Sequence, residues 1–432
     1  MRITVVGMGK IGLPLAVQFA SKGHSVVGAD VVSRTVDLIN AGTEPFPGET
    51  DLARKLAAEV YAGRLSATLD TTEAVRTSDV VVIVVPLFVD QDGIPDFGWM
   101  DAATESVGCG LQRGALVSYE TTLPVGTTRD RFLPALMAQS GLSADDFHLV
   151  FSPERVLTGR TFADLRRYPK LVGGTTPESG DAGVAFYESV LDFDDRPDLE
   201  RANGVWNLGS SEASEMAKLA ETTYRDVNIG LANQFARYAD TRGIDIYSVI
   251  DACNSQIFSH IHRPGIAVGG HCIPIYPQMY LWNDPEATVV RAARAANRAM
   301  PAYAVSLLEQ HHGSLQGQRV AVLGASYRGG VKETAFSGVF DVVAALTSAG
   351  AIPVVNDPLY TSGELDALGF VNYEFGEPID AVIVQANHDE YTRVGAANLP
   401  GVRTIVDGRG ITSPELRDAV PTYVIGAAST HP

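Results

Sequence analysis

The chain has 432 residues, of which 45% are hydrophobic and 19% are charged, and its formal net charge is −18. This length predicts two or three globular domains, and the acidic charge disfavours binding to nucleic acid or to an anionic membrane surface. No apolar run reaches about 18 residues, so we expect no membrane-spanning segment. The three cysteines lack metal-ligand spacing, which predicts neither a disulfide framework nor a metal site and is typical of a reducing cytoplasm.

The first third of the sequence alternates short apolar, β-branched runs with segments of helical periodicity. Runs that are apolar throughout indicate buried parallel strands, and their alternation with helices predicts a doubly wound α/β sheet. The expected strands are Ile3–Val6, Ser25–Asp30, Val80–Val85, Ala115–Glu120, His148–Ser152 and Leu171–Gly174, with helices at Pro14–Lys22 and Ser33–Ala41.

The rest of the chain predicts a long helix and then a second doubly wound domain. Glu212–Tyr238 has apolar residues every three to five positions and predicts one helix that joins the domains and offers a dimer surface. The later strands are expected at Arg319–Leu323, Ile352–Asn356, Ala381–Gln385 and Arg403–Asp407, with a helix at Val339–Ala349 and a frayed tail over 427–432. We therefore expect a cofactor domain at 1–205, a central helical region at 206–305 and a second Rossmann-like domain at 306–432.

The motif Gly7-Met8-Gly9-Lys10-Ile11-Gly12 follows the first expected strand and opens the first expected helix. Glycines at this spacing permit a tight turn, close approach of a pyrophosphate and close helix–strand packing, so the motif predicts a dinucleotide site. Asp30 ends the next strand, where a carboxylate would bind the adenosine ribose and favour NAD over NADP. The alternative is a glycine-rich turn that binds no cofactor.

Arg34 lies near Asp30 in the sequence and would either weaken the preference for NAD or stack on adenine. Pro86 follows the strand at 80–85 and Thr122 follows the strand at 115–120. The expected cofactor-binding set is Gly7, Gly9, Lys10, Ile11, Gly12, Asp30, Arg34, Pro86 and Thr122.

The segment Gly269-Gly270-His271-Cys272-Ile273-Pro274 places a cysteine beside two glycines, which would give a substrate carbon room to approach. With a nicotinamide cofactor in the same chain, a thiolate here could hold an aldehyde for a second oxidation. The alternative is an inert buried thiol.

Several motifs in order resemble the UDP-glucose/GDP-mannose dehydrogenase family over essentially the whole length. They are the N-terminal glycine motif, the segments 120–128 (ETTLPVGTT), 152–155 (SPER), 218–221 (KLAE) and 269–274 (GGHCIP), and Asp407-Gly408-Arg409. The segment 224–229 and the run leading into Gly269 look most like members that act on UDP-N-acetylhexosamines such as UDP-ManNAc or UDP-GlcNAc. The resemblance implies NAD-dependent oxidation of C6 of a nucleotide-linked hexose to the carboxylate, in a homodimer.

The resemblance also implies catalytic roles for four residues. Cys272 matches the nucleophile that forms a thiohemiacetal and then a thioester, and Lys218 matches the lysine that stabilises the oxyanion. Glu154 matches the carboxylate that handles protons and activates water, and Thr122 matches a hydroxyl at the site. The alternatives are a solvated helix face for Lys218, a surface ion pair with Arg155 for Glu154, and a strand-end cap for Thr122.

An anionic nucleotide sugar would be held by arginines, which offer bidentate phosphate contacts. The resemblance implies a substrate-binding set of Glu154, Arg155, Lys218, Arg263, Gly269, Arg328 and Arg409. We expect His271 to pack or to support the site indirectly, and His260 and His262 to be loop residues.

Three positions depart from the family pattern. Tyr276 replaces an aspartate that orders water, Thr222 replaces an asparagine, and Ala335 stands where an arginine is usual, with Lys332-Glu333 nearby. These changes bear most on thioester hydrolysis and leave a two-electron variant open. The sequence is also compatible with a UDP-glucose 6-dehydrogenase, with a β-hydroxyacid or 6-phosphogluconate-type dehydrogenase, and with a catalytically silent binding protein.

Overall fold

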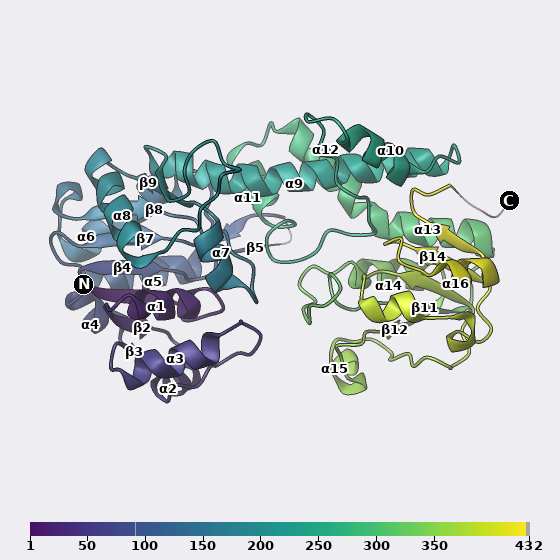
Figure 1. The fold of residues 1–432 in the computed structure, drawn as a ribbon, viewed down its shortest axis with the longest axis horizontal. Helices are drawn as coiled ribbons and strands as arrows, with labels where there is room; N and C mark the ends of the chain where they lie inside the picture. The colour runs from purple at the N-terminus through teal and green to yellow at the C-terminus, as the bar shows by residue number, and fades with distance from the viewer. Residues whose placement is uncertain (91, 429–432) are drawn as a thin grey trace. The chain divides into compact units, whose positions relative to one another are not determined.

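The computed structural model describes residues 1–90 and 92–428 and divides the chain into two compact units, Met1–Ala220 and Glu221–Pro432. Figure 1 shows the helix α9 (Ser211–Asp240), within which the boundary between the two units falls. This confirms the long helix expected at 212–238. Most of the predicted tail, residues 429–432, lies outside the described residues.

The first unit is built on an eight-stranded sheet with the order β10-β9-β8-β7-β4-β1-β2-β3. All neighbouring strands are parallel except β8 and β9, which are antiparallel. The strands are β1 (Arg2–Val6), β2 (Ser25–Ala29), β3 (Leu65–Thr68), β4 (Val80–Ile83), β7 (Leu116–Tyr119), β8 (His148–Phe151), β9 (Lys170–Gly174) and β10 (Val205–Asn207). A separate hairpin joins β5 (Phe88–Val89) to β6 (Pro95–Asp96).

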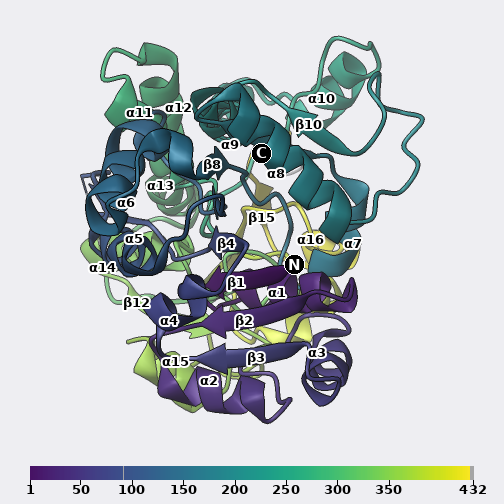
Figure 2. The same cartoon turned by 90° about the vertical axis from the view of Figure 1, so that its left-hand side faces the viewer.

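Helices cover both faces of this sheet, because its central strands are apolar on both sides. Figure 2 shows α1, α3 and α7 on one face and α5 and α6 on the other. The helices of this unit are α1 (Gly12–Ser21), α2 (Ser33–Asn40), α3 (Leu52–Tyr61), α4 (Thr71–Arg76), α5 (Gly98–Gly110), α6 (Leu133–Ser140), α7 (Thr161–Arg167) and α8 (Pro177–Val190). The sheet order reverses between β1 and β4, where α/β domains bind dinucleotides at the carboxyl ends of the strands.

The second unit is built on a five-stranded parallel sheet with the order β12-β11-β13-β14-β15. Its strands are β11 (Arg319–Leu323), β12 (Ile352–Asn356), β13 (Ala381–Val384), β14 (Thr404–Asp407) and β15 (Thr422–Val424). Its helices are α10 (Ile246–Asn254), α11 (Tyr276–Asn283), α12 (Thr288–Arg298), α13 (Met300–His312), α14 (Val339–Ser348), α15 (Ser362–Ala367) and α16 (Pro414–Ala419). Two doubly wound α/β domains joined by a long helix are therefore confirmed.

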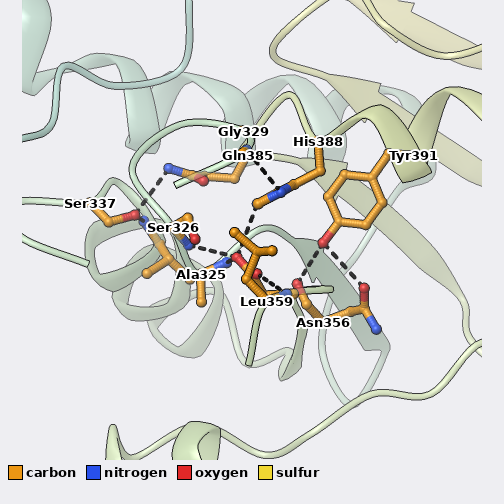
Figure 3. A network of polar contacts seen from close by, with 12 residues as sticks. Ala325, Ser326, Gly329, Ser337, Asn356, Leu359, Gln385, His388 and Tyr391 are labelled. Carbon is orange, nitrogen blue, oxygen red and sulfur yellow. Dashed lines mark hydrogen bonds and ion pairs between the residues drawn. The ribbon is translucent and has the colours of Figure 1, made fainter. Parts of the chain in front are cut away.

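A buried network of polar contacts lies at the carboxyl ends of the strands of this second sheet (Figure 3). Asp357 follows β12, and its carboxylate accepts hydrogen bonds from the backbone amides of Ala325 and Ser326 at 2.9 and 2.8 Å. His388 follows β13, and its Nε2 lies 3.2 Å from the same carboxylate. The network fixes the loops after three neighbouring strands, β11, β12 and β13, without a covalent link.

Three strands of the two main sheets, β3, β10 and β15, were not expected from the sequence. They have three or four residues each and carry polar side chains. They lie at sheet edges, where a continuous apolar run is not required. No helix among the described residues is both long enough and apolar enough to cross a membrane.

Candidate active site

The glycine motif forms the turn between β1 and α1. Gly7 has a φ of 92°, and its amide donates to the Ala29 carbonyl at 2.8 Å. A Cβ at Gly12 would lie 1.9 Å from the Gly7 carbonyl oxygen, whereas a Cβ at Gly9 would meet no protein atom within 4 Å. The first and third glycines are thus required by the protein's own packing, and the second leaves open space for close approach of a phosphate.

This difference between two glycines predicts separable effects of substitution. We expect Gly12→Ala to lower the free energy of unfolding by about 1–3 kcal/mol, because the methyl group overlaps a backbone oxygen. Gly9→Ala should leave the melting temperature nearly unchanged and weaken NAD binding. Thermal melts and NAD titrations of both variants check this, and an unchanged NAD affinity in Gly9→Ala would contradict it.

The carboxylate of Asp30 is fixed next to the same turn. Its Oδ2 accepts from the Met8 amide at 2.8 Å and its Oδ1 accepts from the Val32 amide at 2.9 Å. These contacts place an acid at the carboxyl end of β2 beside the glycine turn, as the sequence analysis expected of a ribose-binding group.

The remaining predicted cofactor residues lie around the carboxyl ends of β1, β2 and β4. Ile11 is partly buried at the start of α1, and Lys10 is exposed in the turn before it. Pro86 is exposed in the segment that follows β4, and Arg34 is exposed on α2. With the glycine turn they lie near the β1–β4 switch point, where α/β domains bind dinucleotides.

Glu154 and Lys218, predicted as catalytic from distant parts of the sequence, are in direct contact. Glu154 follows β8, and the Nζ of Lys218 on α9 donates to its main-chain carbonyl at 2.7 Å. Lys218 is only 8% exposed, so the alternative of a solvated helix face is wrong.

The carboxylate of Glu154 is 11% exposed. It accepts from the Arg155 amide at 2.7 Å and from Lys170 Nζ at 3.0 Å. The alternative of a surface ion pair is therefore wrong for Glu154. The guanidinium of Arg155 donates to the Pro169 carbonyl at 3.2 Å and lies near the Tyr168 ring. Both residues line a small hollow that also includes Pro153, Val156, Asp164, Leu165 and Lys170.

Thr122 lies in the loop after β7 and is buried. The neighbouring Thr121 donates its hydroxyl to the Val85 carbonyl at 2.6 Å, which joins this loop to the end of β4. Farther along, the Glu215 carboxylate accepts from the amides of Gly126 and Thr128 at 2.6 and 2.9 Å. Glu215 lies one turn before Lys218 on α9, so it fixes the loop of Thr122 to the helix that carries the lysine.

Sequence reasoning missed the importance of Glu215, Lys170 and Glu120. Burial raises the pKa of Glu215 to about 7 even though three donors of the loop stabilise its charge. Burial also raises the pKa of Glu120 to about 7, against the opposing effect of Lys170. The sequence did hold a signal for two of these residues, because each is a charged residue beside an apolar run. Lys170 begins the strand at 170–174, and Glu120 ends the strand expected at 115–120.

In the second unit, Cys272 lies in an irregular segment before α11 and is exposed. Its carbonyl accepts from the amides of Ile275 and Tyr276 at 3.2 and 2.9 Å, which turns the chain into α11. The alternative of an inert buried thiol is therefore wrong within this unit. Tyr276 is the first residue of that helix.

The two glycines before Cys272 serve a purpose that differs from the expected one. A Cβ at Gly269 would lie 2.6 Å from the Cβ of Tyr327 and 2.8 Å from the Phe336 carbonyl oxygen. Gly270 has a φ of 90° and donates its amide to the Ala335 carbonyl at 2.8 Å. The room beside the glycines is filled by the protein, so they seat the cysteine loop on residues 327–336 of its own unit and do not make space for a substrate.

The predicted substrate-binding arginines of the second unit lie in two places. Arg263 pairs with Asp251 and stacks on Tyr247, and the Arg409 Nε donates to the Gln385 carbonyl at 2.6 Å. Burial lowers the pKa of Arg409 to about 10, which still leaves it charged near neutral pH.

Arg328 is exposed and contacts the hydroxyl of Tyr327 at 3.0 Å, beside the glycines of the cysteine loop. His271 is 63% exposed and lies 3.3 Å from Glu333, so it does not pack in the interior, and its alternative role of supporting the site indirectly stays a prediction. His260 and His262 lie in loops, as expected. Among the positions that depart from the family pattern, Thr222 is buried on α9 and Ala335 binds Gly270 through its backbone.

Comparison with known proteins assigns the chain to a family. Models of the UDP-glucose/GDP-mannose dehydrogenase family match three successive parts of the chain: the NAD binding domain at residues 1–191, the central domain at 212–299 and the UDP binding domain at 321–414. This chain belongs to that family. It is an NAD-dependent nucleotide-sugar dehydrogenase, which confirms the enzyme class and cofactor expected from the sequence.

Individual relatives agree with the resemblance. A UDP-N-acetyl-D-mannosamine dehydrogenase of Pyrococcus horikoshii is 34% identical over 95% of this chain and 96% of that protein. An NDP-N-acetyl-D-galactosaminuronic acid dehydrogenase of Ralstonia nicotianae is 30% identical over 95% of this chain and 96% of that protein. The solved structure of the UDP-D-ManNAc dehydrogenase of P. horikoshii aligns with a TM-score of 0.87 and 32% identity, over 99% of this chain and all of that one.

Proposed function

We propose that this chain oxidises C6 of a UDP-N-acetylhexosamine, such as UDP-ManNAc or UDP-GlcNAc, from the primary alcohol to the carboxylate. The observation that best supports a catalytic role for the first unit is the contact between Lys218 and the backbone of Glu154, 64 residues apart in sequence. An ammonium and a carboxylate held at the carboxyl edge of a Rossmann-like sheet are suited to proton transfer and to oxyanion stabilisation. The exposed thiol of Cys272 supplies the nucleophile.

In the proposed reaction, NAD+ supplies the oxidising power by accepting a hydride from C6 in each of two oxidations. Glu154 takes up the hydroxyl proton of the alcohol in the first of these, which leaves an aldehyde. The thiolate of Cys272 then bonds to C6, and Lys218 stabilises the oxygen anion of the resulting thiohemiacetal. The second oxidation breaks the C6–H bond and leaves a thioester on Cys272.

Glu154 first releases the proton of the alcohol to solvent and becomes a carboxylate again. Water then attacks the thioester, and Glu154 accepts a proton from the water. The C6–S bond breaks, the thiolate of Cys272 leaves and the uronic acid is released. Because Tyr276 stands where an aspartate usually orders water, we propose that Glu154 and Lys218 are sufficient for this step. Thr122 is proposed to contact the reacting groups from the loop after β7.

The cofactor and the substrate are assigned to different parts of the chain. We propose that residues 1–205 bind NAD through the set around the glycine turn, that 206–305 carry the cysteine loop and the dimer surface, and that 306–432 bind the nucleotide. Arg263, Arg328 and Arg409 are the proposed phosphate ligands, with Arg155 also contacting the substrate and Gly269 contacting it only through its backbone, because the space beside its Cα is filled by the protein. Exposed apolar residues on α9, among them Tyr224, Leu231 and Phe235, support a homodimer. The proposed location is the cytoplasm, where the free thiols would stay reduced.

The test is the number of NADH molecules formed for each sugar nucleotide consumed. We expect a ratio of two with UDP-N-acetylmannosamine or UDP-N-acetylglucosamine, and slower oxidation of UDP-glucose and GDP-mannose. A ratio of one with accumulation of the aldehyde would overturn the four-electron proposal and favour a two-electron variant. Faster oxidation of UDP-glucose would overturn the proposed substrate class, and binding of NAD and UDP-sugars without any NADH would favour a silent binding protein.

A further inference from the structure

A buried cluster of three charges lies beside the proposed proton-handling residue. Lys170 Nζ is 2.7 Å from Glu120 Oε2 and 3.0 Å from Glu154 Oε2. The side chains of Glu120, Lys170 and Glu154 are 0%, 5% and 11% exposed. The hydroxyl of Tyr187 donates to the other oxygen of Glu120 at 2.7 Å and lies 2.7 Å from the Ser118 hydroxyl. The single ammonium group of Lys170 therefore forms ion pairs with two carboxylates that are almost fully shielded from water.

The topology of the sheet explains how Lys170 reaches this position. In a fully parallel sheet, the first residue of a strand lies at the edge opposite the active site. β9 instead runs antiparallel to β8, with Val150 opposite Gly174 and Phe151 opposite Gly173. Continuing this register puts Lys170 opposite Glu154, and the Ser152 hydroxyl bonds to the Leu171 carbonyl at 2.7 Å in accord with it. Because β9 is reversed, its first residue, Lys170, places a cation at the carboxyl edge of the sheet.

The two carboxylates of the cluster respond differently to the same ammonium. Burial raises the pKa of Glu120 to about 7, only partly offset by Lys170. For Glu154 burial acts in the same direction, but the ammonium of Lys170 and the Arg155 amide outweigh it and hold its pKa below the usual value. The ionisation of Glu154 therefore depends on Lys170, and Glu120 competes for that same cation once it ionises itself, near pH 7.

We propose, on the basis of the proposed function, that Lys170 and Glu120 are positioning residues that set the proton affinity of Glu154 for its acid–base work. Lys170 fixes the carboxylate of Glu154 and keeps it ionised. Glu120 partly neutralises Lys170, so that Glu154 can still accept a proton from the substrate or from water. A lysine without this second carboxylate would hold Glu154 too firmly as an anion to be an effective base.

The other groups around the cluster do not replace the ion pairs that Lys170 makes with Glu120 and Glu154. Tyr187 on α8 binds Glu120, and Lys218 on α9 binds the backbone oxygen of Glu154. On the α7 side, the Asp164 carboxylate accepts from the Leu157 amide and from Arg160. The guanidinium of Arg155 and the ring of Tyr168 complete the surroundings.

The decisive experiment compares the pH profiles of two variants. Glu120 ionises near pH 7, where Glu154 is already an anion, so Glu120→Gln should remove a step of the kcat/KM–pH profile near neutral pH and leave the acid limb in place. Lys170→Met removes the stabilising cation, so the acid limb should move to higher pH. We expect a shift of about one pH unit or more, as for a charge within about 4–6 Å of a carboxyl group.

Further variants separate this role from simple stabilisation of the fold. Lys170→Arg keeps the charge and should leave the acid limb in place even if kcat falls, and the double variant Glu120→Gln/Lys170→Met should move the limb as Lys170→Met does. Lys22→Met, which removes a lysine paired with Asp192 on the same unit, is the control and should not move the limb. Loss of activity in Lys170→Met without movement of the acid limb, or a step near neutral pH that persists in Glu120→Gln, would overturn the proposal.

A readout without turnover separates this proposal from the proposed function. The titration of Glu154 is followed by NMR in protein carrying 13C-labelled glutamate, and Glu154→Gln identifies its signal. A shift of this titration to higher pH in Lys170→Met, together with loss of its second inflection near pH 7 in Glu120→Gln, supports the positioning role even if no sugar nucleotide is oxidised, an outcome that would contradict the proposed function alone. An unmoved titration would overturn the positioning role even in a fully active enzyme.

Discussion

Cys272→Ser is expected to reduce steady-state NADH formation by at least about 10³-fold, because the proposed second oxidation needs a covalent bond from sulfur to C6. Serine keeps the shape of the side chain but is a much weaker nucleophile near neutral pH. Since the thiol is exposed, the substitution should leave the melting temperature and NAD binding nearly unchanged. NADH absorbance under saturating substrate measures the effect.

The chain supplies two matched controls for this variant. Cys253→Ser and Cys109→Ser change the other free thiols and should retain full activity. If Cys272→Ser also retained activity, the chemistry would need no covalent intermediate. A two-electron dehydrogenase of the β-hydroxyacid type would then describe the chain better.

The sequence predicted most of the fold because its strands are nearly continuous apolar runs. The runs beginning at Arg319 and Ile352 became β11 and β12 with the expected bounds. Parallel strands buried on both faces leave this signal in the sequence, whereas a short edge strand such as β15 needs no such run. The helix at 212–238 was also predictable, because its 3.6-residue periodicity extends over many turns.

The supporting residues of the candidate site were less accessible to prediction. Glu120 and Lys170 are 50 residues apart, and they meet only because β9 reverses direction after the parallel strands. No local pattern in the sequence reveals the direction of a strand. Likewise, the reason for the glycines before Cys272 is their contact with Tyr327 and Phe336, which lie far along the chain from them. The resemblance pointed to the proposed reacting residues but not to what holds them.

Glu154→Gln is expected to lower kcat by about 10²–10⁴-fold, the usual contribution of a general acid–base group. Glutamine can still accept a hydrogen bond from Lys170, which also keeps its contact with Glu120, so the fold should survive. Because the proposed mechanism also needs Glu154 to remove the alcohol proton, we expect a slow first oxidation and no rapid first phase. If only hydrolysis of the thioester becomes slow, a rapid first phase should instead yield two NADH per active site. The acylated Cys272 would then accumulate and be visible in the mass of the intact protein.

The size of this first phase distinguishes where Glu154 acts. Two NADH per site mean that both oxidations proceed without the carboxylate and that water activation depends on it. One NADH per site would mean that the second oxidation itself has failed, and no first phase would mean that proton removal from the alcohol limits the reaction. Glu178→Gln, on the exposed first turn of α8, should behave as the unmodified enzyme. Full activity in Glu154→Gln would show that the proton acceptor is another group, and Lys218, which binds the Glu154 backbone, would be the next candidate.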